Sequence, residues 1–136
     1  MGFLDGILGS KEQPAHPGLP FNITQALRPV RLSARRDNCL ELLVTIKNVS
    51  DAPVMASAVV EVPRALGFEN LGITKVKEIR MGELAQHAER TVSFSVCATT
   101  QTPHGTYSLL LTVNQHYRDY AHILNYAKKG VEVRAV

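Results

Sequence analysis

Apolar and polar residues alternate along two segments, residues 90–98 and 106–116, which flank a Pro-His-Gly corner at residues 103–105. A period of two places every second side chain on the same face, which is typical of a half-buried β-strand. The apolar faces of the two segments consist of Val92, Phe94, Val96, Tyr107, Leu109, Leu111 and Val113. The pattern therefore predicts two strands that turn one face each toward a common core.

The same alternation recurs on both sides of this region. It predicts further strands over residues 30–35, 40–47, 54–62, 131–135 and, with a mixed pattern, 73–81. Turn-forming residues separate these segments, notably the polar stretch at 48–53 and Pro63. About seven short strands at intervals of about ten residues are typical of an antiparallel β-sandwich. We therefore expect an all-β protein.

Residues 118–130 break this rhythm. Asp119 is a residue type that caps helices, Lys128 and Lys129 would lie in the last helical turn, and Gly130 would end the helix. The alternative is a hairpin arm that continues the β-structure. The sequence leaves one short helix before the last strand and a hairpin as open interpretations.

Three groups of residues follow one another in the order found in a known family. The first is Val-Thr-Ile-Lys-Asn-Val-Ser-Asp-Ala-Pro at 44–53. The second joins Val-Glu-Val-Pro at 60–63 to Met-Gly-Glu-Leu at 81–84 and Val-Ser-Phe-Ser-Val at 92–96, and the third is Pro-His-Gly-Thr-Tyr at 103–107. This order resembles the Ig-like domains of the CARDB type and those attached to bacterial and archaeal glycosidases. The resemblance implies an Ig-like antiparallel sandwich with a corner tyrosine at Tyr107, a binding or spacer role, and no catalytic residues.

The first twenty residues differ from the rest. Residues 10–20 contain three prolines and read as an extended linker, so residues 21–136 are expected to form the sandwich and residues 1–20 a flexible N-terminal arm. Phe3 and Ile7, and Leu4 and Leu8, lie four residues apart and would share one stripe of a helical turn. This apolar peptide could dock on another copy, a different protein or a membrane surface; the alternatives are that it folds back on its own sandwich or is a frayed end.

Composition sets broad limits on function. The chain has 136 residues, 45% of them hydrophobic and 20% charged, which is enough for one globular domain with a core. A net charge of +3 is too small to indicate a nucleic-acid partner by itself. The first ten residues contain Asp5 and no basic residue, so they do not resemble a secretory signal. The expected location is cytoplasmic, or extracellular if an export signal has been removed.

The two cysteines and two of the histidines raise separate questions of chemistry. Alternation points both Cys39 and Cys97 outward, so the preferred interpretation is two free thiols, and a cross-strand disulfide is the alternative if the strands are neighbours. Cys97, His104 and His87 could also serve as ligands of a blue-copper site. No methionine follows His104 to act as the axial ligand, so an ordinary corner histidine is preferred and no metal or other cofactor is expected.

Tyrosine and charged side chains concentrate between residues 116 and 126. Aromatic residues and arginine are enriched at the centres of protein interfaces. The sequence therefore proposes a partner-binding surface at Tyr117, Arg118, Tyr120, His122 and Tyr126, with the apolar peptide at Phe3, Leu4, Ile7 and Leu8 as a second contact. The competing interpretation is that Tyr117 and Tyr120 only cover the end of the core.

Arg28, Arg31, Arg35 and Arg36 form a basic run without interleaved aromatic residues. Charged edge strands resist aggregation, so this role is preferred to nucleic-acid binding. No catalytic constellation is recognisable, and no enzyme activity is expected. The function predicted from the sequence is a non-catalytic protein-interaction or assembly module that can pair with itself as a homodimer. A cupredoxin-like copper electron carrier and a weak basic nucleic-acid binder are the alternatives.

Overall fold

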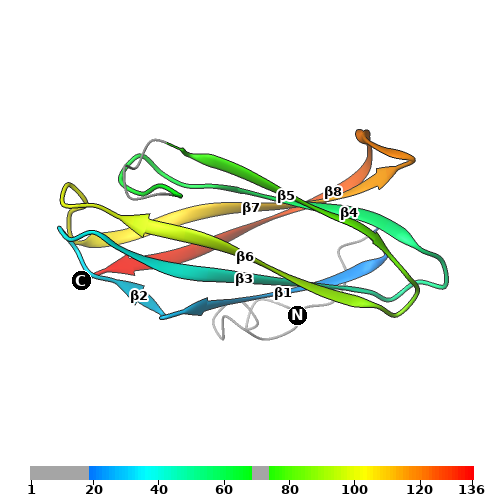
Figure 1. Cartoon of the computed structure of the whole chain (residues 1–136), viewed down its shortest axis with the longest axis horizontal. Coiled ribbons are helices and arrows are strands. Elements are labelled where there is room, and N and C mark those ends of the chain that lie inside the picture. The colour runs from blue at the N-terminus through cyan, green and yellow to red at the C-terminus, as the bar shows by residue number, and fades with distance from the viewer. Residues whose placement is uncertain (1–18, 69–73) are drawn as a thin grey trace.

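The computed structural model of the chain describes residues 19–68 and 74–136. These residues form eight strands and no helix, and the strands stack in two sheets (Figure 1). The strands are β1 (Phe21–Arg28), β2 (Arg31–Leu32), β3 (Asn38–Asn48), β4 (Val54–Glu61), β5 (Val76–Leu84), β6 (Glu89–Ala98), β7 (Gly105–Tyr117) and β8 (Asp119–Ala135). The predicted all-β sandwich is confirmed. No helix in the described ranges is long and apolar enough to cross a membrane.

One sheet has three strands in the order β1-β3-β6, and the other has five in the order β2-β8-β7-β4-β5. Neighbouring strands run antiparallel, except that β2 and β8 run parallel. The core lies between the sheets. Leu42, Val44 and Ile46 of β3 are fully buried there opposite Ala58 and Val60 of β4. The alternation at 40–47 and 54–62 therefore predicted both the strands and the faces that they bury.

The chain enters the sandwich differently from the prediction. The strand expected at 30–35 is reduced to the two residues of β2, and the longer strand β1 precedes it. Pro29 separates the two and offers no backbone N–H to a ladder. Val30 is 70% exposed, whereas Leu32 is buried against the core. The chain passes at Pro29 from the three-stranded to the five-stranded sheet, so the alternation at 30–35 begins directly after a crossing and pairs as a strand only at Arg31 and Leu32.

Residues 118–130 form a hairpin arm and not a helix. β8 runs from Asp119 to Ala135 and pairs with β7 without interruption from Asn125 to Ala135 and again at Ile123 and Asp119. Arg118 makes the turn with a φ of 71°. A helix here would have left one side of β7 without its backbone partners, whereas the hairpin satisfies them and buries Ala127 and Val131 on the core face. Gly130, which was expected to end the helix, lies within β8.

Tyr107 confirms the corner tyrosine that the resemblance implied. Its hydroxyl donates a hydrogen bond of 2.5 Å to the carbonyl oxygen of Pro103. Near the other end of the sandwich, Asn48 is fully buried and its Nδ2 donates to the carbonyl oxygens of Ala52 at 2.8 Å and Leu84 at 3.1 Å. One side chain thus ties the β3–β4 turn to the end of β5. The β7–β8 turn lies at this same end, because Met55 at the start of β4 pairs with His116 near the end of β7.

Candidate interaction surface at the β7–β8 hairpin

The end of the β7–β8 hairpin exposes apolar side chains to solvent. In the described part of the chain eight large hydrophobic side chains are exposed, and four of them lie in this hairpin. They are Tyr117 (49% exposed), Ile123 (55%), Leu124 (58%) and Tyr126 (52%), which we call the hairpin patch. The other four are scattered over the molecule. Exposed apolar side chains that gather in one place, rather than singly, mark interaction surfaces.

Irregular strand pairing explains why this region turns apolar residues outward. Gln115 pairs with Asn125 and His116 pairs with Ile123, so Leu124 is an extra residue on β8 without a partner on β7. Such a bulge breaks the alternation of faces and bends the strand. Ile123 and Leu124 therefore both reach solvent although they are consecutive. In Figure 1 the tip of the hairpin bends away from the rest of the five-stranded sheet.

Two cations lie against the tyrosines of the hairpin patch. The guanidinium carbon of Arg118 is 5.0 Å from the ring centre of Tyr117, and the Lys128 ammonium is 5.7 Å from that of Tyr126. Stacked cations hold aromatic rings in place and contribute positive charge to the surface. Asp119 lies 2.7 Å from Nδ1 of His122. This hydrogen bond keeps the pKa of Asp119 below its usual value, so the turn carries both signs of charge.

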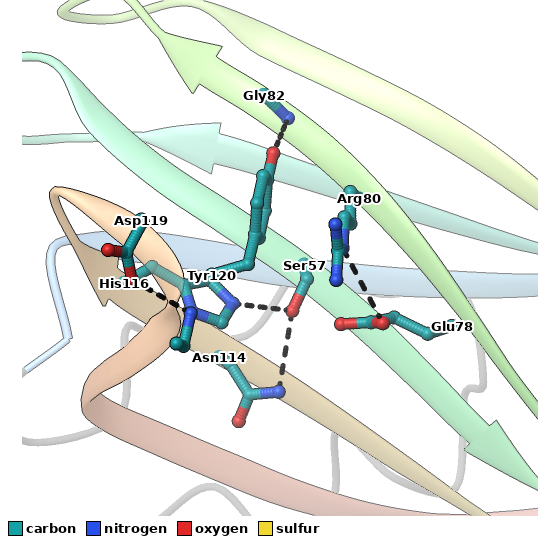
Figure 2. Close-up of polar contacts among 9 residues, drawn as sticks. Ser57, Glu78, Arg80, Gly82, Asn114, His116, Asp119 and Tyr120 are labelled. Carbon is teal, nitrogen blue, oxygen red and sulfur yellow. Dashed lines mark hydrogen bonds and ion pairs between the residues drawn. The ribbon is translucent and has the colours of Figure 1, made fainter.

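Below the hairpin patch, a buried polar cluster connects the hairpin to β4 (Figure 2). Ser57 Oγ lies 2.7 Å from Nε2 of His116, and Asn114 donates a longer hydrogen bond of 3.4 Å to the same oxygen. With Asn114 donating to it, the Ser57 hydroxyl can direct its proton at a neutral histidine ring. Burial lowers the pKa of His116, which also favours the neutral form.

Tyr120 fixes the hairpin to β5. Its hydroxyl accepts a hydrogen bond of 2.8 Å from the backbone N–H of Gly82 (Figure 2). Its ring packs edge-on against His116, with 4.9 Å between ring centres, and Arg80 covers it at 4.7 Å. These contacts occupy the side chain within the protein. The alternative interpretation was that Tyr117 and Tyr120 both cover the end of the core. Tyr120 has this structural position, whereas Tyr117 does not.

The structure brings together most of the residues proposed for partner binding. Tyr117, Arg118, His122 and Tyr126 are all exposed at the hairpin. Phe3, Leu4, Ile7 and Leu8 lie outside the described residues. The sequence analysis did not single out Ile123 and Leu124. Their signal was that two apolar residues are adjacent, which in a strand directs one of them outward unless both faces are buried.

The cysteines differ from the preferred interpretation of free thiols. Cys39 and Cys97 are paired opposite each other on β3 and β6 and form a disulfide. Cys97 lies, as predicted, on the face of β6 that points away from the core, together with the exposed Cys39, but it is buried, and Gly67 exchanges two backbone hydrogen bonds with it, of 2.7 and 3.0 Å, at the edge of β6. The sulfur of Cys97 is therefore not available to copper as a thiolate. His87 precedes β6, and Cys97 lies near the far end of the same strand. These two residues of the alternative copper site are therefore about 30 Å apart along an extended strand.

The basic run lies far from the hairpin patch. Arg31 of β2 is opposite Arg134 near the C-terminal end of β8, and the N–H of Arg35 bonds to the carbonyl oxygen of Thr102 beside β7's first residues. Both positions are at the opposite end of the β7–β8 pair from Arg118. The arginines and the hairpin patch therefore form two separate surfaces.

A polar hollow of about 290 Å³ lies on the outer face of the three-stranded sheet. Its lining consists of Thr24, Gln25, Ala26, Arg28, Leu43, Thr45 and Thr91. Thr45 and Thr91 bond to each other at 2.7 Å across β3 and β6. On the same face Glu41 accepts hydrogen bonds from Ser93 and Ser95, which lower its pKa. The threonine pair and the Glu41 cluster satisfy their own hydrogen bonds, whereas Oε1 of Gln25 is buried without a hydrogen-bond partner. In the described ranges no three His, Cys, Asp or Glu residues gather as a metal-binding group.

Comparison with known proteins finds similar solved structures but no similar sequence. No protein-family model matches the sequence, and no curated protein matches it either. Among solved structures, the chain is similar to the ASH/PapD-like domain 7 of human CEP192, with 12% identity and a TM-score of 0.48 over 93% of this chain and 92% of that one. It is also similar to part of a Bacteroides uniformis β-glucuronidase, with 8% identity and a TM-score of 0.49.

The second similarity covers 84% of this chain but only 13% of the glucuronidase, so the chain corresponds to a small part of that enzyme. A third structure, the alkylpurine DNA glycosylase AlkC of Pseudomonas fluorescens, gives 15% identity and a TM-score of 0.43 over 88% of this chain and 32% of that one. The all-β character of the described residues rests on their own eight strands, and these three structures are what the chain is similar to. At these identities and scores the likeness concerns the fold and carries no statement about activity.

Proposed function

We propose that the protein is a non-catalytic interaction module that binds a protein partner through the hairpin patch. The observation that carries this proposal is the concentration of half the exposed large apolar side chains of the described residues at one bulged hairpin. Tyr117 and Tyr126 add large, rigid contact area and Arg118 and Lys128 add charge, which is the composition of interface centres. The resemblance to CARDB-type domains, which serve as binding or spacer modules, is consistent with this role.

The partner surface has a rigid support. Tyr120, His116 and Ser57 hold the base of the hairpin to β5 and β4. A surface that is ordered before binding loses less conformational entropy on association than a loop that must first become ordered. The proposed module therefore presents the hairpin patch in a fixed position. Assembly with a second copy of the chain through this patch is one form that such binding can take.

The disulfide supports a proposal about location. Disulfides persist in oxidising compartments and are rare where glutathione keeps thiols reduced. Because Cys39 and Cys97 are paired, we favour an extracellular or otherwise oxidising environment over the cytoplasm. Titration of thiols in denatured protein, purified without reductant, tests this: two reactive thiols per chain would contradict it.

The hairpin patch is tested by comparing partner capture by matched single variants. Leu124→Ser changes the most exposed residue of the hairpin patch, and Val76→Ser changes a side chain of similar exposure (54%) on β5, the other edge of the same sheet. Proteins captured by the full chain are identified and then titrated in purified form. We expect Leu124→Ser to weaken binding about tenfold or more, about 1.4 kcal/mol, and Val76→Ser to leave it unchanged. Equal affinity of the wild type and Leu124→Ser would overturn the proposal.

A further inference from the structure

Arg31 and Arg134 lie side by side on the outer face of the five-stranded sheet. They are partners in the parallel pairing of β2 with β8, so their Cα atoms are about 5 Å apart. The next residue on each strand, Leu32 and Ala135, is buried in the core. Because successive side chains of a strand point to opposite faces, both arginines point away from the core, and both are exposed. Figure 1 shows this C-terminal end of β8 beside β2, at the other end of the strand from the hairpin tip.

In the described part of the chain, this pair of guanidinium groups has no acidic counter-charge in contact with it. Among residues 19–68 and 74–136, no carboxylate forms an ion pair with Arg31 or Arg134. Glu132 is on the same outer face, two residues before Arg134, and the two do not form an ion pair. Like charges that are neighbours across a strand pair repel each other. An anion that binds both arginines would offset this repulsion.

Protection of a sheet edge against aggregation explains only part of the basic charge at this end. β2 is an edge strand of its sheet, so Arg31 can serve that purpose. Arg134 lies on β8 between β2 and β7 and is therefore not at the edge. Arg35 and Arg36 lie in the turn between β2 and β3, outside both strands. Three of these four arginines need a different explanation.

The turn between β2 and β3 is held in place and adds positive charge at the same end. The side chain of Asn38 accepts a hydrogen bond from the N–H of Ser33 at 2.9 Å and donates one to the carbonyl oxygen of Arg36 at 2.8 Å. The N–H of Arg35 donates to the carbonyl oxygen of Thr102 at 2.8 Å. Arg35 has a φ of 57°, a left-handed conformation that glycine or asparagine adopts more easily than arginine. The two arginines of this ordered turn raise the positive potential around the β2–β8 pair.

The charges and donors of the paired arginines match a phosphate monoester better than other common anions. Two guanidinium groups carry two positive charges, and each can donate two parallel hydrogen bonds. The exposed Thr106, opposite Arg134 on β7, adds a hydroxyl on the same face. A phosphate monoester has a charge of about −2 near pH 7 and three strong acceptor oxygens, whereas a carboxylate has two oxygens and a single charge. A phosphodiester of a nucleic acid also carries a single charge.

We propose that Arg31 and Arg134, with Thr106 beside them, bind the phosphate group of a phosphate monoester. The bound group would bridge β2 and β8 and offset the repulsion between the two arginines. A soluble phosphorylated compound and the headgroup of a monoester phospholipid both present this chemistry. The site is at the opposite end of the β7–β8 pair from the hairpin patch, so the inference does not depend on partner binding there.

Titration of the full chain with methyl phosphate tests this site, with the amide signals of Arg31, Arg134 and Thr106 followed by NMR at about pH 8, where the monoester is fully ionised. We expect these signals to shift and to saturate. Dimethyl phosphate and methyl sulfate, which carry a single charge, should bind at least about tenfold more weakly at equal ionic strength. Equal affinity for the singly and doubly charged esters would overturn the proposal. So would preferential, salt-sensitive binding of a DNA duplex, which would instead indicate a nucleic-acid surface.

Single variants that change one charge each distinguish this site from the overall charge of the protein. Arg31→Gln and Arg134→Gln should each weaken the binding of methyl phosphate about tenfold or more. Lys47→Gln removes an exposed positive charge near the last residue of β3, at the other end of the sandwich, and should change the affinity less than about twofold. Glu132→Gln should strengthen binding, because it removes a carboxylate from the same face. The amide spectrum of each variant checks that it is folded, and wild-type affinity in both arginine variants would overturn the proposal.

Vesicles separate the two sources of the phosphate group. Co-sedimentation with phosphatidylcholine vesicles that contain phosphatidic acid, a monoester, is compared with vesicles that contain the same fraction of phosphatidylglycerol, a diester. A preference for the monoester vesicles that Arg134→Gln abolishes would assign the lipid headgroup. Saturable binding of methyl phosphate without such a preference would assign a soluble compound. Failure of both probes would overturn the proposal.

Discussion

The edge strands β6 and β8 differ in how many contacts hold their outer sides. β6 is tied at both ends: Gly67 pairs with Cys97 near the end of the strand, and Arg90 near its start donates a hydrogen bond to the carbonyl oxygen of Met81. A disulfide further joins Cys97 to Cys39 on the inner neighbour β3. β8 has β2 beside it only at its last residues, and its other end carries exposed apolar side chains.

This difference separates structural from accessible parts of the sandwich. Contacts that cross an edge prevent another strand from adding there, and they link the two sheets. An edge without such contacts contributes less to stability but remains available for binding. We therefore expect substitutions near β6 to act mainly on stability and substitutions at the end of β8 mainly on recognition. The following predictions test that division, beginning with the largest effect.

Removal of the disulfide should cause the largest loss of stability. Cys39 and Cys97 are 58 residues apart, and a cross-link that closes a loop of this length restricts the unfolded chain by about 4 kcal/mol in the chain-entropy model. Cys39→Ala combined with Cys97→Ala should lower the free energy of unfolding, measured with denaturant, by about this amount. Reductant should destabilise the wild type and leave the double variant unchanged. A double variant as stable as the oxidised wild type would show that the disulfide does not stabilise the β6 side.

Tyr120 joins the accessible end of β8 to the structural part of the sandwich. Tyr120→Phe removes the hydrogen bond to Gly82 and should cost about 1 kcal/mol, while Tyr120→Ala also removes the ring that lies between His116 and Arg80 and should cost about 2–3 kcal/mol. Thermal unfolding measures both. Tyr117→Ala is the matched control, since its ring is exposed, and it should change stability by less than about 0.5 kcal/mol. Equal losses for Tyr117→Ala and Tyr120→Ala would remove the distinction between the two tyrosines.

The sequence predicted the interior of the sandwich better than its edges. The alternation around Leu42 and Ala58 determines which face is buried, and that information is local. The position of Val30 depended on where the chain crosses between sheets, which a local pattern does not contain. Cys97 is buried although it points away from the core, and it pairs with Gly67, which is thirty residues earlier in the chain. The edges are determined by such distant contacts.

The candidate site was only partly predictable, because part of it depends on local residue types and part on contacts with distant residues. The density of tyrosine and arginine near residue 118 was visible in the sequence and indicated a surface. The segment forms a strand and not a helix because β7 has an edge with which it can pair. Only this hairpin places Ile123 and Leu124 in solvent. Tyr117 and Tyr120 lie on the two sides of the turn at Arg118, where the pairing of β7 and β8 is irregular, and the spacing of apolar residues did not reveal this turn.

His116 should make the base of the hairpin sensitive to acid. Burial lowers its pKa in the folded protein, so the unfolded chain takes up a proton below about pH 6.5 that the folded protein does not bind. The free energy of unfolding should therefore fall as the pH decreases from 6.5 toward the lowered pKa, with a slope of at most about 1.4 kcal/mol per pH unit from this group. Among the charged groups that act on the pKa of His116, Glu78 and Asp119 raise it and Arg80 lowers it, while burial has the largest effect.

The measurement is denaturant unfolding between pH 7.5 and pH 5 for the wild type and His116→Gln. The variant should be less stable at neutral pH, because it loses the contact with Ser57, and should show a flatter dependence on pH. His104→Gln, at an exposed corner, should retain the slope of the wild type. An unchanged slope in His116→Gln would show that other groups cause the acid sensitivity.

Leu124→Ser should have the smallest effect on stability and the clearest effect on recognition. Leu124 is 58% exposed and lies on the bulge without a partner on β7, so its removal leaves no cavity in the core. Its effect on the free energy of unfolding should be below about 0.5 kcal/mol. Leu109→Ser in the buried part of β7 provides the contrast, because a polar side chain there loses buried apolar area and should cost several kcal/mol. If Leu124→Ser destabilised the protein as strongly as Leu109→Ser, the end of β8 would be part of the core. The division between a structural β6 side and an accessible β8 side would then fail.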